Sequence, residues 1–160
     1  MVGDIREMVF VQVEQDQGTT ANLYSLDLKT EALLQEILPW SEGFANFGMR
    51  IGDLMCGMDH WWRAKDPNGP RELADALRLH AEPYFAGRRS LSDQAKCLGR
   101  GSPTFGNSLV RMRLALTLYR MGQIDEACQS LRNPSKWAYR NFGKNIDAVR
   151  NWLGSPREQA

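Results

Sequence analysis

Thiol chemistry is the first reaction that this sequence suggests, because one short stretch holds the residue types for it. In "GDLMCGMDHWW", residues 52–62, Cys56 precedes His60 by four positions and Asp59 adjoins the histidine. A cysteine nucleophile needs a base that accepts its proton, a group that orients the base, and a lowered pKa. One hypothesis is therefore a thiol-dependent enzyme that uses Cys56, His60 and Asp59. Side chains on a strand or a tight turn need not converge, however, so the sequence favours a protein without catalytic residues.

A metal or cofactor site is not predicted. Zinc takes four ligands in closed sites, or three and a water in catalytic ones. The only histidine besides His60 is His80, and Cys97 and Cys128 lie far from Cys56 without any C-x-x-C spacing. The acidic residues around the stretch lack the alternating spacing and terminal Glu of a calcium loop. The chain also has no phosphate-binding glycine loop followed by Lys and Ser or Thr.

The two adjacent tryptophans favour a surface that recognises a partner. Trp61 and Trp62 point to opposite faces if the segment is extended. We expect one indole ring to pack on helices and the other to lie at an edge or a partner surface, with its N–H group near a polar neighbour. The predicted partner-binding residues are Asp53, Asp59, Trp61, Trp62 and Asp66.

The charge distribution along the chain is uneven although the net charge is only +1. Residues 1–85 hold 7 Lys and Arg against 14 Asp and Glu, whereas residues 86–160 hold 13 against 5. Either the two halves pack together and neutralise each other, or the acidic half masks a partner with a cationic surface. An isoelectric point of only about 7.7 argues against nucleic-acid binding through the basic C-terminal helices.

Composition indicates an ordinary globular chain of one domain. It has 160 residues, of which 42% are hydrophobic and 24% charged. No run approaches the roughly 20 apolar residues of a membrane-spanning helix. The N-terminus lacks the apolar core of a secretory signal. Three cysteines, an odd number, fit free thiols in a reducing cytoplasm better than disulfides.

Alternation of side chains predicts strands in the N-terminal part. Residues 8–14 and 21–28 alternate and flank a turn at Gly18, which predicts an antiparallel hairpin. A third strand is expected within residues 41–54. Three expected faces are Val9, Val11 and Val13 on one side of the first strand, Phe10, Gln12 and Glu14 on its other side, and Tyr24, Leu26 and Leu28 on one side of the second.

Apolar residues at helical spacing predict helices in the remainder of the chain. The expected ranges are 31–38, 70–82, 91–98, 107–121, 123–131 and 139–153. Thr30 is the expected N-cap of the first and Ser90, with Asp93, that of the third. Pro83 is expected to end the second helix, and Gly122 to cap the fourth at its C-terminus.

These elements together predict an α+β fold, in which a small antiparallel β-sheet packs against helices and the C-terminal half is helical. We expect a single domain over residues 1–160, with a β-rich part at about 8–62 and a helical part at about 70–153.

Two local patterns are familiar. "VFVQVEQDQGTTANLYSLDL" followed by "MRIGDLMCGMDHWWRAKDPNGPRELADALRLHAEPYF" resembles an uncharacterised bacterial family, domain of unknown function 4304, over about residues 8–98. That resemblance implies no activity and no catalytic residue. "LALTLYRMGQIDEACQSL", within about residues 109–131, is similar to a tetratricopeptide-type helix hairpin, in which Gly122 permits the turn and Ala127 permits close helix approach.

The leading functional expectation is a non-enzymatic protein–protein interaction protein of bacterial type. A toxin-neutralising, immunity-like protein or another regulatory binder would fit this description. The two alternatives are the thiol-dependent enzyme built on Cys56, His60 and Asp59, and a nucleic-acid binder that uses its basic C-terminal helices.

Overall fold

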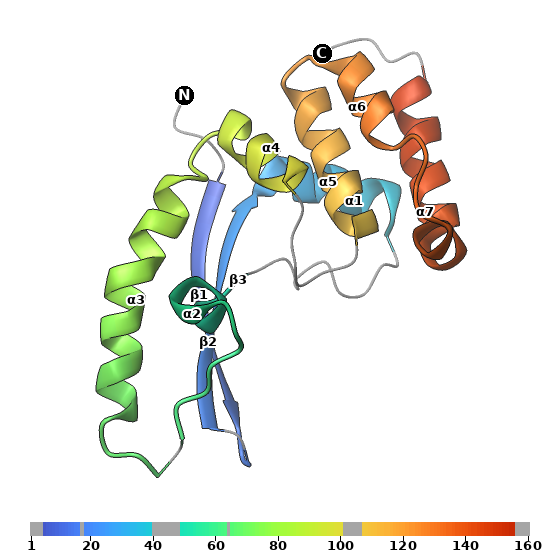
Figure 1. Ribbon diagram of the computed structural model, residues 1–160. Coiled ribbons are helices and arrows are strands. Elements are labelled where there is room, and N and C mark those ends of the chain that lie inside the picture. Colours follow the sequence, from blue (N-terminus) through green and yellow to red (C-terminus); the bar gives the residue numbers. More distant parts are fainter. Residues whose placement is uncertain (1–4, 17, 40–48, 64, 101–106, 156–160) are drawn as a thin grey trace. The chain divides into compact units, whose positions relative to one another are not determined.

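A computed structural model describes residues 5–16, 18–39, 49–63, 65–100 and 107–155 of the chain. The strands are β1 (Ile5–Glu14), β2 (Gly18–Asp27) and β3 (Met49–Arg50). The helices are α1 (Leu28–Ile37), α2 (Ile51–Cys56), α3 (Gly69–Ala86), α4 (Leu91–Gly99), α5 (Asn107–Arg120), α6 (Ile124–Ser130) and α7 (Lys136–Gly154) (Figure 1). The expected α+β class, with a small antiparallel sheet and a helical C-terminal half, is confirmed. No helix in this described part is both long enough and apolar enough to cross a membrane.

The chain forms two compact units that do not follow the division expected from sequence. The first, here called the sheet unit, comprises Ile5–Leu26 and Ala45–Arg89. The helical unit is the rest of the chain, chiefly Asp27–Phe44 and Ser90–Ala160. Helix α3 therefore belongs with the sheet, and α1 with the C-terminal helices. The single domain expected from sequence stays a prediction.

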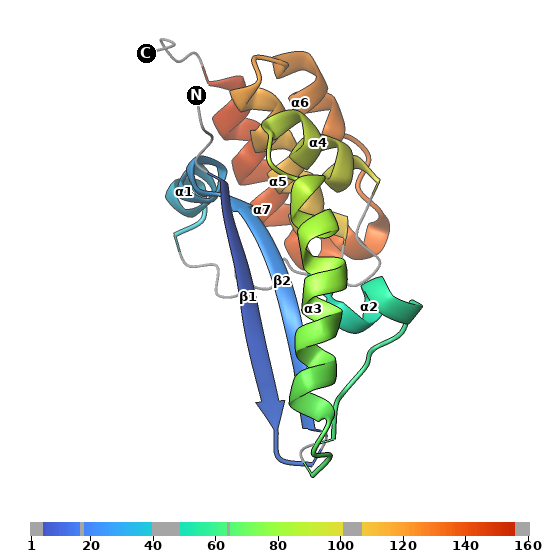
Figure 2. The ribbon, with the colours of Figure 1, turned by 90° about the vertical axis from the view of Figure 1, so that its left-hand side faces the viewer.

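The sheet has the order β1-β2-β3, so β1 is an edge strand. Burial along β2 alternates: Ala21 and Leu23 are fully buried, whereas Tyr24 and Leu26 are half-buried. Helix α3 runs along the sheet on the Leu23 side (Figure 2). The buried core of this unit consists of Ala21, Leu23, Ile51, Trp62, Leu73, Ala76, Tyr84 and Phe85. The expected Tyr24 and Leu26 face is thus the open face of the sheet rather than the buried one.

The third strand is shorter than expected. Only Met49 and Arg50 pair with β2, opposite Leu23 and Asn22 respectively. The chain from Ile51 to Cys56 is the helix α2 rather than a strand. Residues 41–48 of the expected strand lie outside the described part. The helix forms because Ile51 and Leu54, at a spacing of three, both pack into the core of the sheet unit.

Pro83 does not end α3, which continues to Ala86. An internal proline costs a helix about 3 kcal/mol. The next two residues, Tyr84 and Phe85, are 8% and 6% exposed. Burying such side chains contributes about 1.5–3 kcal/mol each, which offsets the cost of the proline.

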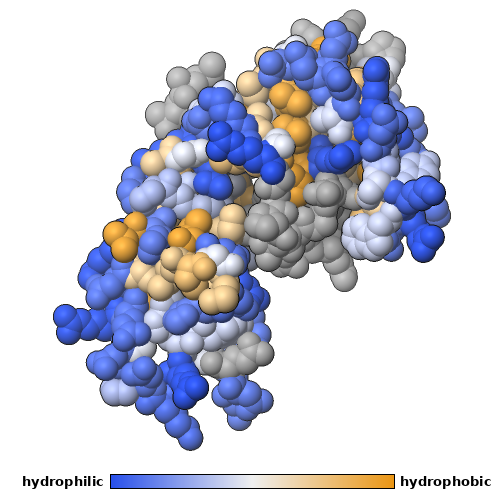
Figure 3. All heavy atoms as spheres, in the orientation of Figure 1, coloured by the Kyte–Doolittle hydropathy of each residue, from blue (hydrophilic) through white to orange (hydrophobic). Residues whose placement is uncertain are grey.

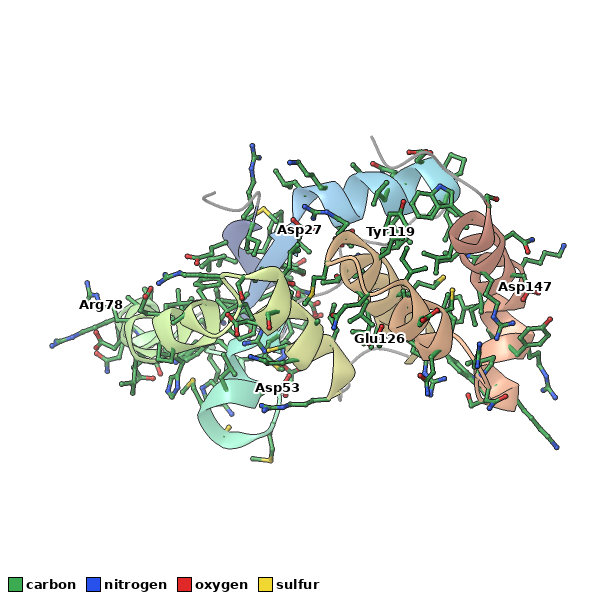
Figure 4. The ribbon with its side chains drawn as sticks, turned by 90° about the horizontal axis from the view of Figure 1, so that it is seen from above. Asp27, Asp53, Arg78, Tyr119, Glu126 and Asp147 are labelled. Atoms are coloured by element: carbon green, nitrogen blue, oxygen red, sulfur yellow. The ribbon has the colours of Figure 1, made fainter. Side chains whose placement is uncertain are left out.

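The core of the helical unit comes from α1, α5, α6 and α7. Its buried members are Leu34, Met112, Ala115, Leu116, Ala127, Leu131, Ile146, Val149 and Leu153. Tyr119 of α5, labelled in Figure 4, stacks edge-on against Trp152 of α7 with centroids 4.9 Å apart. The expected α5–α6 hairpin turns at Gly122, whose φ of 79° suits glycine.

Two ion pairs join α1 to α5 inside this unit. The Arg113 guanidinium donates to both carboxylate oxygens of Glu31, at 2.5 and 2.9 Å, and its side chain is only 4% exposed. Arg120 pairs with Asp27. Asp27 is also the N-cap of α1, because its carboxylate accepts the backbone N–H of Thr30 at 3.0 Å. The expected cap at Thr30 was wrong by three residues.

Candidate functional site

The edge strand β1 exposes four large apolar side chains. Val9, Phe10, Val11 and Val13 are 44%, 65%, 51% and 69% exposed. Apolar side chains on an exposed edge strand are typical of a surface that other proteins cover. The alternation of β1 was correct as a strand signal, but neither of its two faces is fully buried.

A hollow of about 370 Å³ lies on the open face of the sheet. Its lining residues are Met8, Phe10, Val11, Gln12, Asn22, Tyr24 and Leu26. The Phe10 and Tyr24 rings meet edge to face with centroids 6.2 Å apart. The Asn22 side chain donates to Gln12 Oε1 at 3.3 Å. Two aromatic rings and two amides therefore stand side by side across β1 and β2, an arrangement that offers both apolar area and hydrogen-bonding groups.

Arg50 extends this surface, because it lies in β3 and contacts the loop that precedes α3. It pairs with β2 directly opposite Asn22, which places its side chain on the open face. Its guanidinium contacts the Asp59 carboxylate and lies 5.3 Å from the centroid of the Trp61 ring. Trp61 Nε1 donates to the same carboxylate at 2.9 Å. Arg50, Asp59 and Trp61, here called the Arg50 cluster, hold one another in place at the rim.

The positive charge of Arg50 affects the pKa of a group in the Arg50 cluster and of a group in the hollow. Burial alone would raise the pKa of Asp59, but the hydrogen bonds from Arg50 and Trp61 and the charge of Arg50 together bring it below its ordinary value. Burial raises the pKa of the Tyr24 hydroxyl, and the positive charge of Arg50 partly opposes that rise. The same guanidinium thus acts on the carboxylate at the rim and on the phenol in the hollow.

The two tryptophans separate as expected from an extended segment. Trp62 is 5% exposed, packs in the core of the sheet unit, and exchanges two backbone hydrogen bonds of 2.8 Å with Thr19. Trp61 is half-buried over Arg50. Trp62 is consequently a core residue, which leaves Trp61 as the indole that a partner can reach.

Two glycines allow the loop of residues 57–63, which carries Asp59 and Trp61, to lie close to β2 and α2. A Cβ atom on Gly18 would lie 2.1 Å from the carbonyl oxygen of Trp62. One on Gly52 would lie 2.4 Å from the backbone nitrogen of His60. The loop is also held by a 2.8 Å hydrogen bond from the Thr20 hydroxyl to the His60 carbonyl. The backbone that carries Asp59 and Trp61 is therefore fixed on both sides.

The other two predicted site residues lie outside the Arg50 cluster. Asp66 is exposed in the turn before α3, where its carboxylate accepts the backbone N–H of Asn68 at 2.9 Å. Asp53 lies in the first turn of α2 (Figure 4). One of its carboxylate oxygens is buried without a hydrogen-bond partner among the described residues.

The three residues of the thiol hypothesis bind to different neighbours. The Cys56 thiol donates to the carbonyl oxygens of Gly52 and Met58, at 3.4 and 3.8 Å. The His60 ring packs edge-on against Trp62, with centroids 4.5 Å apart. Asp59 is taken up by the Arg50 cluster, so no hydrogen bond links thiol, imidazole and carboxylate in the part of the chain described. Within that part, no group of three or more His, Cys, Asp or Glu is placed to hold a metal ion.

Helix α2 adds a smaller apolar surface. Figure 3 shows apolar side chains gathered over α2 and the turn that follows it. Met55 and Met58 are 38% and 67% exposed there. Methionines are flexible and polarisable, so they suit a surface that adapts to a partner.

Several basic residues of the C-terminal half are paired within the helical unit. Besides Arg113 and Arg120, which pair with acids of the same unit, Arg150 donates to Asp147 at 3.0 Å and to the Leu131 carbonyl at 2.5 Å. Arg100, Arg111 and Arg132 instead line a hollow of about 430 Å³, together with Leu98, Gly99, Val110, Leu114, Gln129 and Ser130.

Sorting the charges by unit removes most of the asymmetry seen along the sequence. The sheet unit contains eight Lys and Arg against nine Asp and Glu. The acids of the first half and the bases of the second meet in pairs such as Glu31 with Arg113 and Glu7 with Arg89. Internal neutralisation therefore accounts for much of the uneven distribution.

No protein-family model, curated protein or solved structure matches this chain. The resemblances to domain of unknown function 4304 and to a tetratricopeptide-type hairpin stay predictions. Arg50, Phe10 and Tyr24 are the site residues that sequence reasoning missed. The available signal was the alternation that puts Phe10 and Gln12 on one face of the first strand and Tyr24 on one face of the second.

Proposed function

We propose that this protein is a non-enzymatic binder of another protein, and that it docks its partner on the open face of the sheet unit. The observation that carries the proposal is the exposed Phe10, packed beside Tyr24 over a hollow of about 370 Å³. The Arg50 cluster would form the charged rim of this docking surface.

The residue types on this surface are those that dominate protein interfaces. Aromatic residues, methionine and arginine are enriched in interface cores, and Trp, Tyr and Arg supply most of the binding energy. Phe10 and Tyr24 give the apolar centre, while Arg50 and Trp61 lie at its edge. Because Asp59 already holds Arg50 and Trp61 in position, little side-chain entropy remains to be lost when a partner binds.

The expected partner is matched by shape and apolar area more than by overall charge. The sheet unit is close to neutral, so a broad attraction for a cationic surface has little basis in it. Charge recognition would be local, at the Arg50 cluster. A toxin-neutralising or regulatory protein that acts by covering a surface of its partner belongs to this class.

Affinity capture from the native host tests the proposal. We expect one stoichiometric partner that is retained by the wild-type protein and lost with Phe10→Ala or Tyr24→Ala. Leu79→Ala is the matched control, because Leu79 is 68% exposed on α3 and does not line the hollow. Truncating a central aromatic side chain should weaken binding by about 2 kcal/mol or more.

Two results would count against this function. One is the absence of a stoichiometric partner for the wild-type protein. The other is a partner that binds Phe10→Ala, Tyr24→Ala and Leu79→Ala with equal affinity, since the docking surface would then lie elsewhere. Circular dichroism of each variant shows that the fold is retained.

A further inference from the structure

The outer edge of β1 is a free strand edge in the part of the chain that the structure describes. β1 lies at the end of the sheet order, so the backbone groups that point away from β2 have no partner strand within the sheet. Natural proteins protect such edges with Pro, Lys, bulges or short strands. The sequence of β1, "IREMVFVQVE", has ten residues and contains neither Pro nor Lys. Apolar side chains are exposed along the whole of β1, with Phe10 beside Tyr24 on the open face and Val9, Val11 and Val13 at the positions that alternate with it.

We propose that a second copy of this chain covers this edge, by pairing β1 with β1 of its partner in antiparallel orientation. A two-fold axis normal to the sheet keeps each face of both copies on the same side. Opposite residues must then belong to the same face, because the side chains of directly opposed residues stand side by side. The axis consequently lies level with one residue of β1, which faces the same residue of the partner; this residue is called the residue on the axis.

Charge complementarity selects the residue on the axis. With Phe10 on the axis, Arg6 lies opposite Glu14, and the symmetry makes this pair twice. The apolar pairs of that register are Phe10 with Phe10 and Val9 with Val11. Nearly the whole strand takes part, and both exposed faces lose apolar area to the partner.

The neighbouring registers lack this match. With Val9 on the axis, Arg6 would lie opposite Gln12. With Val11 on the axis, Glu14 would lie opposite Met8. Within the ten residues of β1, neither of these registers places opposite charges side by side. The register centred on Phe10 is therefore the one in which polar ends enclose an apolar centre.

The dimer joins two sheets into one continuous sheet and removes the free edge of β1. Phe10 of each copy then lies next to Phe10 of the other, so the two open-face hollows adjoin across the axis. The dimer shares Phe10 with the proposed docking surface, but it does not depend on the binding of a different protein, because it forms through the outer edge of the strand. It also gives the exposed valines of β1 a partner that the sheet unit itself does not supply.

Charge reversal combined with mass measurement tests the dimer. In sedimentation equilibrium we expect the full chain to approach twice 18.2 kDa with increasing concentration. Arg6→Glu puts like charges opposite each other twice, and should raise the dissociation constant roughly tenfold. Glu14→Arg alone should act in the same direction. The double variant Arg6→Glu with Glu14→Arg restores opposite charges and should recover the wild-type association.

Cross-linking tests the register separately. In a Cys56→Ser background, Phe10→Cys brings two thiols face to face at the axis, so mild oxidation should yield a covalent dimer. Val13→Cys is the control, because Val13 would lie opposite Glu7 and its own thiols would be far apart. Equal cross-linking of both variants contradicts the register.

A chain that stays monomeric at all concentrations overturns the dimer, as does an association constant that neither charge reversal changes. Partner capture reports on the proposed function independently. A monomer that still captures its partner refutes only the dimer, whereas a dimer with no partner refutes only the proposed function.

Discussion

Gly52→Ala is the sharpest test of how the loop of the Arg50 cluster is positioned. Gly52 lies within helix α2, where alanine is the better helix former by about 1 kcal/mol. Without a neighbour at this position, the substitution would therefore stabilise the protein. The added Cβ atom, however, would lie 2.4 Å from the His60 backbone nitrogen and 2.5 Å from the Met58 carbonyl oxygen.

The magnitude follows from the size of the overlap. Ordinary contact begins at 3.4 Å, so the His60 nitrogen must retreat by about 1 Å, and it is a backbone atom that no side-chain rotation can move. Overpacking of this kind costs about 1–3 kcal/mol. Retreat of the loop also breaks the hydrogen bond from Thr20 to the His60 carbonyl, at about 1 kcal/mol. After the gain in helix propensity is subtracted, we expect a loss of about 1–3 kcal/mol.

The assay is urea unfolding at equilibrium, followed by tryptophan fluorescence and circular dichroism. Gly57→Ala is the matched control at the end of the same helix, because a Cβ atom there meets nothing within 4 Å. It should cost only about 1 kcal/mol, through its φ of 72°. A Gly52→Ala protein as stable as the wild type, or more stable, would refute the close approach of the loop to α2.

Two further predictions concern the ion pairs. Glu31→Ala removes the carboxylate that pairs with the buried Arg113 and should cost about 3–5 kcal/mol in urea unfolding. Arg113→Met together with Glu31→Leu should cost much less, and equal losses would contradict the buried pair. The second prediction concerns pH, because the pKa of Asp59 is lower in the folded state than in the unfolded chain. The ionised carboxylate therefore stabilises the fold. This contribution is complete above the ordinary pKa of 3.8 and is lost as the pH falls through the lowered pKa. Urea midpoints measured below pH 3.8 should therefore fall less steeply for Asp59→Asn than for the wild type, and identical slopes would show that Arg50 does not hold this carboxylate.

Elements whose signals are local were predictable from the sequence. The alternation of β1 and β2, the Ser90 cap of α4 and the glycine turn at Gly122 need only a few neighbouring residues to be read. The capping serine accepts the backbone N–H of Asp93 at 3.1 Å, as the spacing suggested. Such features follow from backbone geometry and side-chain period, which act over one or two turns.

The errors fell where distant residues compete with a local preference. Pro83 remains inside α3 because Tyr84 and Phe85 are buried in the sheet unit. The segment Ile51–Cys56 alternates like a strand in part, yet it is a helix because Ile51 and Leu54 reach the same core. Local propensity is worth about 1 kcal/mol or less per residue, so the burial of a few large side chains outweighs it.

The candidate site was found only in part for the same reason. The sequence pointed to Asp59 and Trp61, but it gave no means of finding Arg50, which joins them after pairing with β2. It named both Trp61 and Trp62 as partner-binding residues and expected one indole to pack on helices, but it could not say which; the bridge to Thr19 places Trp62 in the core.

The order of residue types along the chain was enough to specify the periods: two for the strands, near 3.6 for the helices, with glycine and capping residues between them. Which face of each element is covered, and which acids and bases meet, depends on how the elements pack against one another. Glu31 and Arg113 are 82 positions apart, as are Glu7 and Arg89. Residues that far apart are brought together by the packing of whole elements, and the period of any one element is the same whichever neighbour it packs against.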